Sequence, residues 1–192
     1  MEPLAPRPNF MMQHGMTGAE TGTAYHRAMR FISLKTLGEL EGRELIDNIR
    51  LQLDSMRRRE LLTSDEREAV RPTVLAQFFG GETGSRLRNA ADVRRELPFN
   101  VLTLASQALT GEEMRGSDGD MLVQGTIDCC FMEDGQWVLL DYKTNRTDDL
   151  EGVKKHYARQ LELYAYALEK ITHIPVKDKI LCLISMGLEF HY

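Results

Sequence analysis

The dipeptide Asp134-Gly135 constrains the fold of this chain more than any other feature of the sequence. Its residues readily take the positive φ angles of a two-residue hairpin turn, and apolar-rich segments flank it over 121–131 and 137–144. These segments are predicted to be antiparallel strands joined by a tight turn. The length of the turn then determines which residues of the two strands lie opposite one another.

The predicted register brings two acidic side chains together. With a two-residue turn, Glu133 pairs with Gln136. Counting outward from this pair places Asp128 directly opposite Asp141, with Cβ atoms about 4.5–5.5 Å apart on one face of the sheet. Because side chains alternate along a strand, Lys143 shares the face of Asp141.

Two opposed carboxylates repel each other, and the repulsion brings the protein no structural benefit. A divalent cation turns it into binding, and closely spaced hard oxygen ligands suit Mg²⁺ or Mn²⁺ far better than Zn²⁺. The alternative is a pair of solvated aspartates on an exposed face of the sheet. Because the strands are rich in apolar residues, among them Val138, Leu139 and Leu140, we favour the metal site.

Hydrophobic periodicity predicts helices first and then the order β-β-β-α-β-β. The first helix, with Tyr25, Met29 and Ile32 on one face, is expected to be capped by Thr21 or Thr23. This order predicts a mixed α/β (α+β) fold with a central sheet flanked by helices and a helical N-terminal part. We expect a linker or irregular arm over 1–16 and a single domain over 17–192. The other predicted elements are helices over 41–56, 64–79, 83–90 and 153–171, strands over 93–99, 121–131, 137–144, 179–186 and 188–191, and a polar loop over 111–120.

Charge and cysteine content narrow the class of protein. With 24 Lys and Arg against 29 Asp and Glu, the net charge of −5 counts against a freestanding nucleic-acid binder. A carboxylate-rich metal site also moves the charge in the acidic direction, so we treat this as a mild penalty. Three cysteines are too few to ligate an iron–sulfur cluster or a structural zinc, and reduced, buried thiols are expected. No P-loop pattern occurs in the sequence, so no ATP site is expected.

The hydropathy of the chain predicts neither a membrane segment nor an export signal. No apolar run approaches the roughly 18 residues that a membrane helix needs. The N-terminus also lacks the basic and then apolar layout of a signal peptide. A cytoplasmic protein without a membrane partner is therefore expected.

Five short motifs occur in one order along the chain and together resemble a known family. Asp128 followed by Asp141-Tyr142-Lys143 is similar to the D…(D/E)-x-K core of the PD-(D/E)XK nuclease superfamily. The set closely resembles the C-terminal nuclease domain of AddA-type (RecB-like) bacterial helicase–nucleases, from about Thr21 to the last residue. Ile127 replaces the proline of the core pattern, a mild departure. The motifs are Gly22-Thr23-Ala24-Tyr25-His26, Arg95-Glu96-Leu97-Pro98-Phe99, Gln124-Gly125-Thr126-Ile127-Asp128, Asp141-Tyr142-Lys143-Thr144 and Gln160-Leu161-Glu162-Leu163-Tyr164.

The resemblance implies a restriction-endonuclease-like core with a Mg²⁺ site, in which Mn²⁺ is able to substitute. Lys143 would orient or help to deprotonate the attacking water and offset charge on the phosphate. Glu96 would bind water on the metal or hold Lys143; its alternative is a salt bridge to Arg94 or Arg95. Away from its motif, His26 reads as a packed or surface histidine. The implied metal ligands are His26, Asp128, Asp141 and the backbone carbonyl of Tyr142.

Residues of the helix over 153–171 are implied to contact DNA or to support the site. Gln160 and Tyr164 lie one turn apart on one helix face, although Tyr164 also belongs to the apolar stripe and competes as a core residue. The basic start of the helix suits phosphate contacts, with an ordinary solvated helix end as the alternative. Its basic residues are Lys154, Lys155 and Arg159.

Together these features predict metal-dependent hydrolysis of DNA, expected to be exonucleolytic on single strands. By the resemblance, the partners would be helicase domains of a parent chain and an AddB-like partner chain, acting in double-strand break repair and recombination. The related AddB-type domain carries a cysteine-ligated iron–sulfur cluster, for which this chain has too few cysteines. Two alternatives stay open. One is a non-catalytic domain that binds DNA ends or acts as a scaffold, and the other is a stand-alone phage-type exonuclease of the same superfamily.

Overall fold

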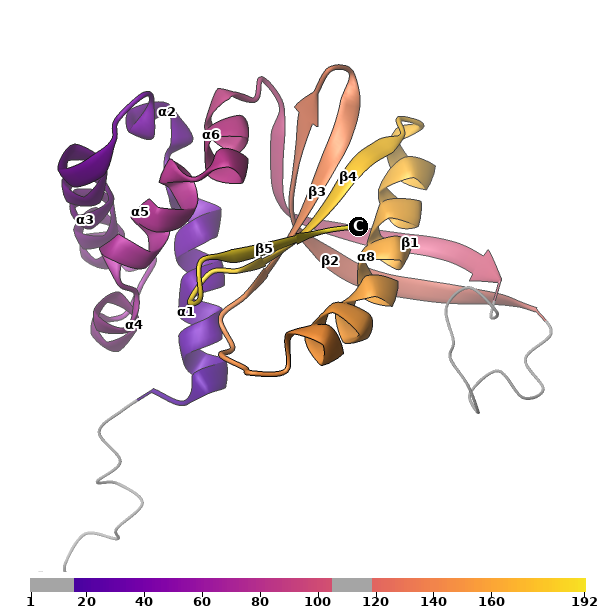
Figure 1. Ribbon diagram of the computed structural model, residues 1–192, viewed down its shortest axis with the longest axis horizontal. Helices are drawn as coiled ribbons and strands as arrows, with labels where there is room; N and C mark the ends of the chain where they lie inside the picture. The colour runs from indigo at the N-terminus through magenta and orange to yellow at the C-terminus, as the bar shows by residue number, and fades with distance from the viewer. Residues whose placement is uncertain (1–15, 105–118) are drawn as a thin grey trace, which may run out of the picture.

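A computed structural model describes residues 16–104 and 119–192 of the chain. The arm predicted over 1–16 and the polar loop predicted over 111–120 lie almost wholly outside these residues. The described residues form a central sheet between two helical layers (Figure 1).

The sheet has five strands in the order β1-β2-β3-β4-β5. β3 and β4 run parallel, and the other neighbouring pairs are antiparallel, so the predicted mixed sheet is confirmed. A parallel pair needs a crossover connection, and the long helix between β3 and β4 supplies it. The strands are β1 (Val93–Leu104), β2 (Asp120–Glu133), β3 (Gln136–Lys143), β4 (Val176–Leu183) and β5 (Leu188–His191).

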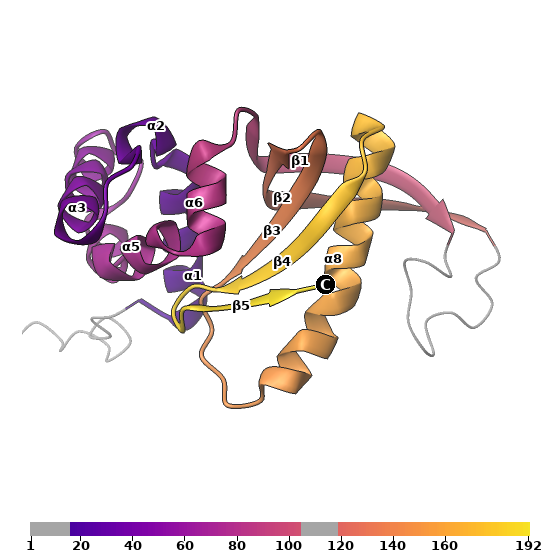
Figure 2. The same ribbon diagram turned by 45° about the horizontal axis from the view of Figure 1, so that its top comes forward.

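The helices divide between the two faces of the sheet. The N-terminal helices gather on one side, and the crossover helix α8 (Leu150–Thr172) runs along the other (Figure 2). Within the described residues, no helix is both long and apolar enough to span a membrane. The N-terminal helices are α1 (Gly18–Phe31), α2 (Leu34–Leu37), α3 (Gly42–Arg58), α4 (Ser64–Ala69), α5 (Pro72–Gly80) and α6 (Glu82–Asn89).

Two details of the predicted helices are wrong. The helix expected over 64–79 is split into α4 and α5, because Pro72 has no backbone N–H to donate and its ring blocks a continuous helix, so it starts α5. The N-cap of α1 is Thr17 rather than Thr21 or Thr23, and Thr17 forms a capping box with Glu20.

Each face of the sheet carries its own core. The core on the side of the N-terminal helices includes Cys129, Phe131, Val138 and Leu140, all with no exposed area. The core under α8 includes Ile127, Cys130, Trp137 and Leu139, together with Leu161 and Leu168 of the helix. The sheet is thus covered on both faces, as its apolar strands require.

The register of the β2–β3 hairpin agrees with the prediction near the turn and departs from it at the aspartates. Glu133 pairs with Gln136, and the pairing continues as far as Cys129 with Leu140. The ladder ends there, so the expected direct pair of Asp128 and Asp141 does not form.

The departure has a local cause in β1 and β2. Ile127 and Cys130 both pack under α8, although strict alternation would put residues three apart on opposite faces. β2 therefore changes face at Asp128. Opposite this position on β1 lies Glu96, whose φ of 50° is in the left-handed region that non-glycine residues rarely occupy. A strained backbone held in place by its surroundings is a common mark of a functional site.

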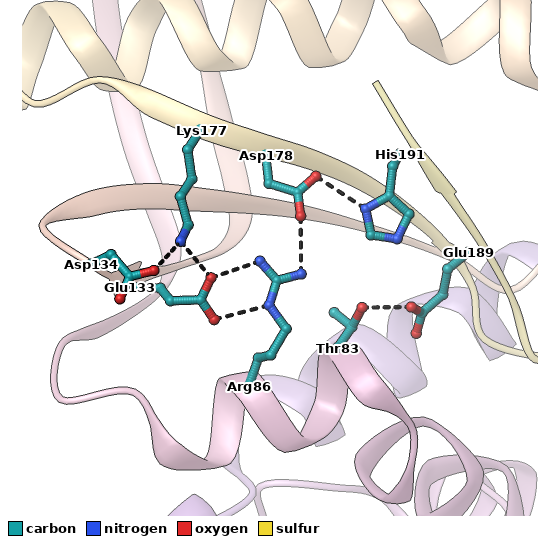
Figure 3. A network of polar contacts seen from close by, with 8 residues as sticks. All are labelled: Thr83, Arg86, Glu133, Asp134, Lys177, Asp178, Glu189 and His191. Carbon is teal, nitrogen blue, oxygen red and sulfur yellow. Dashed lines mark hydrogen bonds and ion pairs between the residues drawn. The ribbon is translucent and has the colours of Figure 1, made fainter.

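An ion network fastens α6 to the sheet at the hairpin end (Figure 3). Arg86 donates two hydrogen bonds of 2.9 Å to the carboxylate of Glu133 and one of 3.0 Å to Asp178 of β4. Lys177 lies 2.7 Å from both Glu133 and Asp134. Hydrogen bonds from Arg86, and then from Lys177, lower the pKa of Glu133 to about 2. The network ties the helical part of the chain to two strands of the sheet.

Candidate metal and catalytic site

Helix α1 passes the end of β3 at close range. A Cβ atom at Gly22 would lie 3.2 Å from the hydroxyl oxygen of Thr144, so the missing side chain permits this approach. One turn further along α1, the Nε2 atom of His26 lies 3.0 Å from the backbone carbonyl oxygen of Tyr142. The packing of α1 thereby brings His26 to the sheet, from more than a hundred residues away in sequence.

His26, Glu96 and Asp128 meet where β1 and β2 change face. One ligand atom from each lies within 4.8 Å of the others. The Nδ1 atom of His26 is 3.4 Å from Asp128 Oδ1 and 3.9 Å from Glu96 Oε1. The three side chains are partly exposed, at 30% for His26, 27% for Glu96 and 13% for Asp128, so the group is open to a solvent ion.

Both ring nitrogens of His26 face oxygen acceptors. Nε2 donates to the Tyr142 carbonyl, and Nδ1 lies next to the Asp128 carboxylate. Acceptors on both sides of the ring favour its doubly protonated, imidazolium form. The hydrogen bond to Asp128 raises the pKa of His26, against the opposing effect of burial.

The second carboxylate oxygen of Asp128 has a structural task. Oδ2 accepts a hydrogen bond of 2.8 Å from the backbone N–H of Tyr142, beyond the point where the β2–β3 ladder ends. Asp128 thus continues the link between the strands and keeps Oδ1 pointed at His26. The side chain of Tyr142 is buried against Phe78, and its ring also lies edge to face with the ring of His26, with centroids 6.2 Å apart.

Glu96 belongs to this group rather than to a surface ion pair. Arg94 pairs with Asp92 and lies over the ring of Trp137, while Arg95 donates to two carbonyls at the end of α1. Burial, and then the nearby charge of Asp128, raise the pKa of Glu96. The expected alternative of a salt bridge from Glu96 to either arginine is absent among the described residues.

Asp141 and Lys143 form an ion pair beside the three-residue group. The Nζ atom of Lys143 is 2.6 Å from Oδ2 of Asp141, which is 1% exposed and receives no well-directed hydrogen bond. Burial raises the pKa of Asp141 to about 6, although the charge of Lys143 works against this shift. Burial opposes the charge of Lys143, but the attraction of Asp141 outweighs it and the pKa of Lys143 is raised. Asp141 lies beside the group of His26, Glu96 and Asp128 rather than within it, and its role as a metal ligand stays a prediction.

Helix α8 places the ring of Tyr157 next to the ammonium group of Lys143. The sequence alone did not predict this contact. The Nζ atom of Lys143 lies 4.7 Å from the ring centroid of Tyr157. In the sequence, Tyr157 is simply one member of the apolar stripe of the helix. Its position could have indicated a role at the site, because it lies one turn before Gln160 and two turns before Tyr164 on the same side of α8.

Gln160 and Tyr164 interact with each other next to the site. The side-chain amide of Gln160 donates a hydrogen bond of 2.7 Å to the Tyr164 hydroxyl. The Tyr164 ring packs edge to face on Phe99 with centroids 5.5 Å apart, so this residue also belongs to the core under α8. The expected core packing of Tyr164 is therefore observed, whereas its support of the site or contact with DNA stays a prediction.

The basic residues at the start of α8 differ in their surroundings. Lys154 pairs with Glu151 at 3.4 Å and lies over the ring of Phe190. Lys155 is exposed, and Arg159 is partly buried. Of the three residues, Lys155 is the most accessible to a phosphate group.

Comparison with known proteins places this geometry in context. The chain is similar to bacterial proteins that are named as ATP-dependent helicase/nuclease subunits. It is 36% identical over 193 residues to that of Bacillus licheniformis, 37% over 190 residues to that of Bacillus velezensis and 34% over 197 residues to that of Bacillus pumilus. These alignments cover 96%, 94% and 97% of the chain. The chain spans 15% of the length of each relative.

A family model also matches most of the chain. The model described as the PD-(D/E)XK nuclease superfamily matches residues 7–186. This match contains the carboxylates where β1 and β2 change face, the Asp141-Tyr142-Lys143 segment of β3 and the whole of α8. The chain therefore belongs to the PD-(D/E)XK nuclease superfamily.

Proposed function

We propose that this chain hydrolyses phosphodiester bonds of DNA with the help of Mg²⁺, for which Mn²⁺ is able to substitute. The observation that carries the proposal is the meeting of His26, Glu96 and Asp128 within 4.8 Å, beside the pair formed by Asp141 and Lys143. These residues come from four separate elements, and a purely structural role would not require two acids and a histidine to converge on one partly exposed point.

The donor set fits a hard divalent cation. Glu96 and Asp128 offer carboxylate oxygens, and His26 offers one ring nitrogen after it loses a proton. Asp141 supports the fit in a different way, because its buried carboxylate, paired with Lys143 at 2.6 Å, lies beside this group of ligands. We propose that His26, Glu96 and Asp128 hold the cation, with Asp141 and the Tyr142 carbonyl as further candidate ligands. When bound, such a cation lowers the pKa of a water molecule and stabilises charge on the scissile phosphate.

Lys143 supplies a fixed positive charge to the reaction. In the metal-free chain its raised pKa favours the ammonium form at neutral pH, and in this form it donates hydrogen bonds. In this form Lys143 orients the attacking water and offsets the negative charge that develops on the phosphate oxygens. Asp141 holds the ammonium group at the end of β3 by direct contact.

The proposed substrate and partners rest on the resemblance to AddA-type helicase–nucleases, and the charge of the chain is consistent with them. We propose that the chain cleaves single strands from their ends and that a helicase motor, in one polypeptide with it, delivers them. An AddB-like partner chain would complete the assembly in double-strand break repair. A net charge of −5 gives the chain little electrostatic grip on DNA, and we propose that Lys155 and Arg159 of α8 supply weak, salt-sensitive contacts.

The test is incubation of the 192-residue chain with end-labelled single-stranded DNA, in Mg²⁺ or in excess EDTA and with or without ATP. We expect cleavage with Mg²⁺, none with EDTA and no effect of ATP. Asp128→Asn is the control for a contaminating nuclease. Undiminished cleavage in EDTA would refute the metal site.

Two further measurements distinguish exonuclease from endonuclease action, and a nuclease from a non-catalytic DNA-binding domain. Circular single strands should resist the chain if cleavage starts at DNA ends, and cutting of circles would show endonuclease action. Binding to DNA ends without cleavage in either Mg²⁺ or Mn²⁺ would identify a non-catalytic domain that has kept the fold.

A further inference from the structure

The ammonium group of Lys143 lies between two side chains from different elements. Asp141 of β3 contacts it at 2.6 Å, and the centroid of the Tyr157 ring from α8 lies 4.7 Å from it. We propose that Tyr157 is a positioning residue for the reaction, holding Lys143 by a cation–π contact. This inference rests on the proposed function, in which Lys143 meets the water and the phosphate.

Lysine needs such a restraint more than most residues. Its stem has four rotatable carbons and large rotamer freedom, so a single contact leaves the ammonium free to swing. Asp141 lies two residues before Lys143 on the same strand and restrains it from one side only. Tyr157 adds a contact from another element. A ring neither binds a divalent cation nor takes a proton, so it holds Lys143 without competing for the metal.

The surroundings of Tyr157 keep its ring in place. The start of α8 is fixed by the side chain of Asp149, which accepts a hydrogen bond from the N–H of Gly152. Tyr192 strengthens this anchor, because its hydroxyl donates a hydrogen bond of 2.9 Å to the carbonyl of Lys154. The ring of His156 packs edge to face on that of Tyr157, with centroids 4.7 Å apart. These contacts fix the position of the Tyr157 ring before substrate binds.

The first experiment compares two substitutions at this position. Tyr157→Leu keeps an apolar side chain and removes the ring, whereas Tyr157→Phe keeps the ring and removes only the hydroxyl. We expect Tyr157→Leu to reduce kcat by about 2- to 30-fold, the range expected for a cation–π contact. KM for DNA and the affinity for Mn²⁺ should stay within about twofold of the parent, and Tyr157→Phe should restore most of kcat. Equal losses in both variants would overturn the proposal.

Tyr166→Leu is the matched control. Tyr166 is also a partly buried tyrosine of α8, and its ring lies 5.5 Å from the ammonium of Lys170, away from the site. Its loss removes the same kind of contact from the same helix. A similar fall of kcat in this variant would show that Tyr157 acts through the stability of α8.

A double-mutant cycle tests whether Tyr157 acts through Lys143. If it does, Tyr157→Leu should have no further effect in a Lys143→Ala background, where there is no ammonium to hold. A purely packing role would cost the same factor in both backgrounds. Additive losses would therefore refute the positioning role.

A spectroscopic measurement on the metal-free chain makes the test independent of cleavage. Protons of the Lys143 side chain beside an aromatic face should be shifted upfield by the ring current, with the signal assigned by its loss in Lys143→Ala. The shift should persist in Tyr157→Phe and vanish in Tyr157→Leu. An unshifted signal in the parent would overturn the proposed contact, whereas a shifted signal in a chain that does not cleave DNA would refute the proposed function instead.

Discussion

Binding of a divalent cation should release protons from the site, and the number released should depend on pH. Both ring nitrogens of His26 face oxygen acceptors, so Nδ1 must lose its proton before it can ligate a metal. Asp141 has a pKa raised to about 6 by burial, so it too is partly protonated in mildly acidic solution. Metal ligands must be deprotonated, and each proton displaced appears in the solvent.

The size of the effect follows from these two groups. At pH 6 about half of the Asp141 side chains carry a proton, because the pH equals the pKa. More than half of the His26 rings do so, because their pKa is raised from an ordinary value of 6.5. If both are ligands, about one proton or more leaves per cation at pH 6. Two half-protonated ligands also weaken the apparent affinity at least about fourfold relative to the deprotonated site, whereas at pH 8 Asp141 contributes almost nothing.

Calorimetric titration with Mn²⁺ in two buffers of different ionisation enthalpy, at pH 6 and pH 8, counts the protons. His26→Gln should remove more than half a proton from the count at pH 6, and Asp141→Asn about half. A count near zero at pH 6 in the parent chain would refute this account of the site. If His26→Gln reduces the number of released protons but Asp141→Asn does not, Asp141 is not a ligand. His26, Glu96 and Asp128 are then the remaining candidate side-chain ligands.

Three further substitutions test other parts of the structure. Lys143→Ala should keep Mn²⁺ binding in calorimetry yet lower kcat by about 10²-fold, and cleavage at the parent rate would contradict its role. Arg86→Ala should lower the free energy of unfolding by about 1–2 kcal/mol in urea at pH 7 without changing cleavage. Because the pKa of Glu133 is lowered from 4.5 to about 2, this loss should be full above about pH 4.5 and shrink as the pH falls toward 2; a loss independent of pH would contradict the ion pair. Gly125→Ala would put a Cβ atom 2.7 Å from the Phe99 ring, and a fall of about 1–3 kcal/mol is expected in the same assay; an unchanged value would show that the ring moves freely.

Much of the sheet was predictable because local chemistry decides it. The Asp134-Gly135 turn does set the register from Glu133–Gln136 to Cys129–Leu140, since a two-residue turn leaves the flanking residues no other pairing. The order of helices and strands was also predictable, because hydrophobic periodicity depends only on neighbours along the chain. Local chemistry also explains the error at Pro72, because a continuous helix was predicted across a residue that cannot lie within one.

The site itself was only partly predictable. His26, Glu96, Asp128, Asp141 and Lys143 were singled out by motif, but the simple hairpin register did not predict that the strand pairing ends before Asp128 and Asp141. Asp128 meets Glu96 and His26 because β1 and β2 change face where Glu96 has a positive φ, and no alternation rule foresees such a change.

What the sequence by itself determined is therefore the turn, the element order and the identity of the candidate site residues. The tertiary structure decided which of them meet. The approach of α1 to the end of β3 brings His26 to the carboxylates, and the packing of α8 sets Tyr157 against Lys143. The physical reason is that contacts between residues far apart in the chain depend on how whole elements pack, which no local pattern encodes.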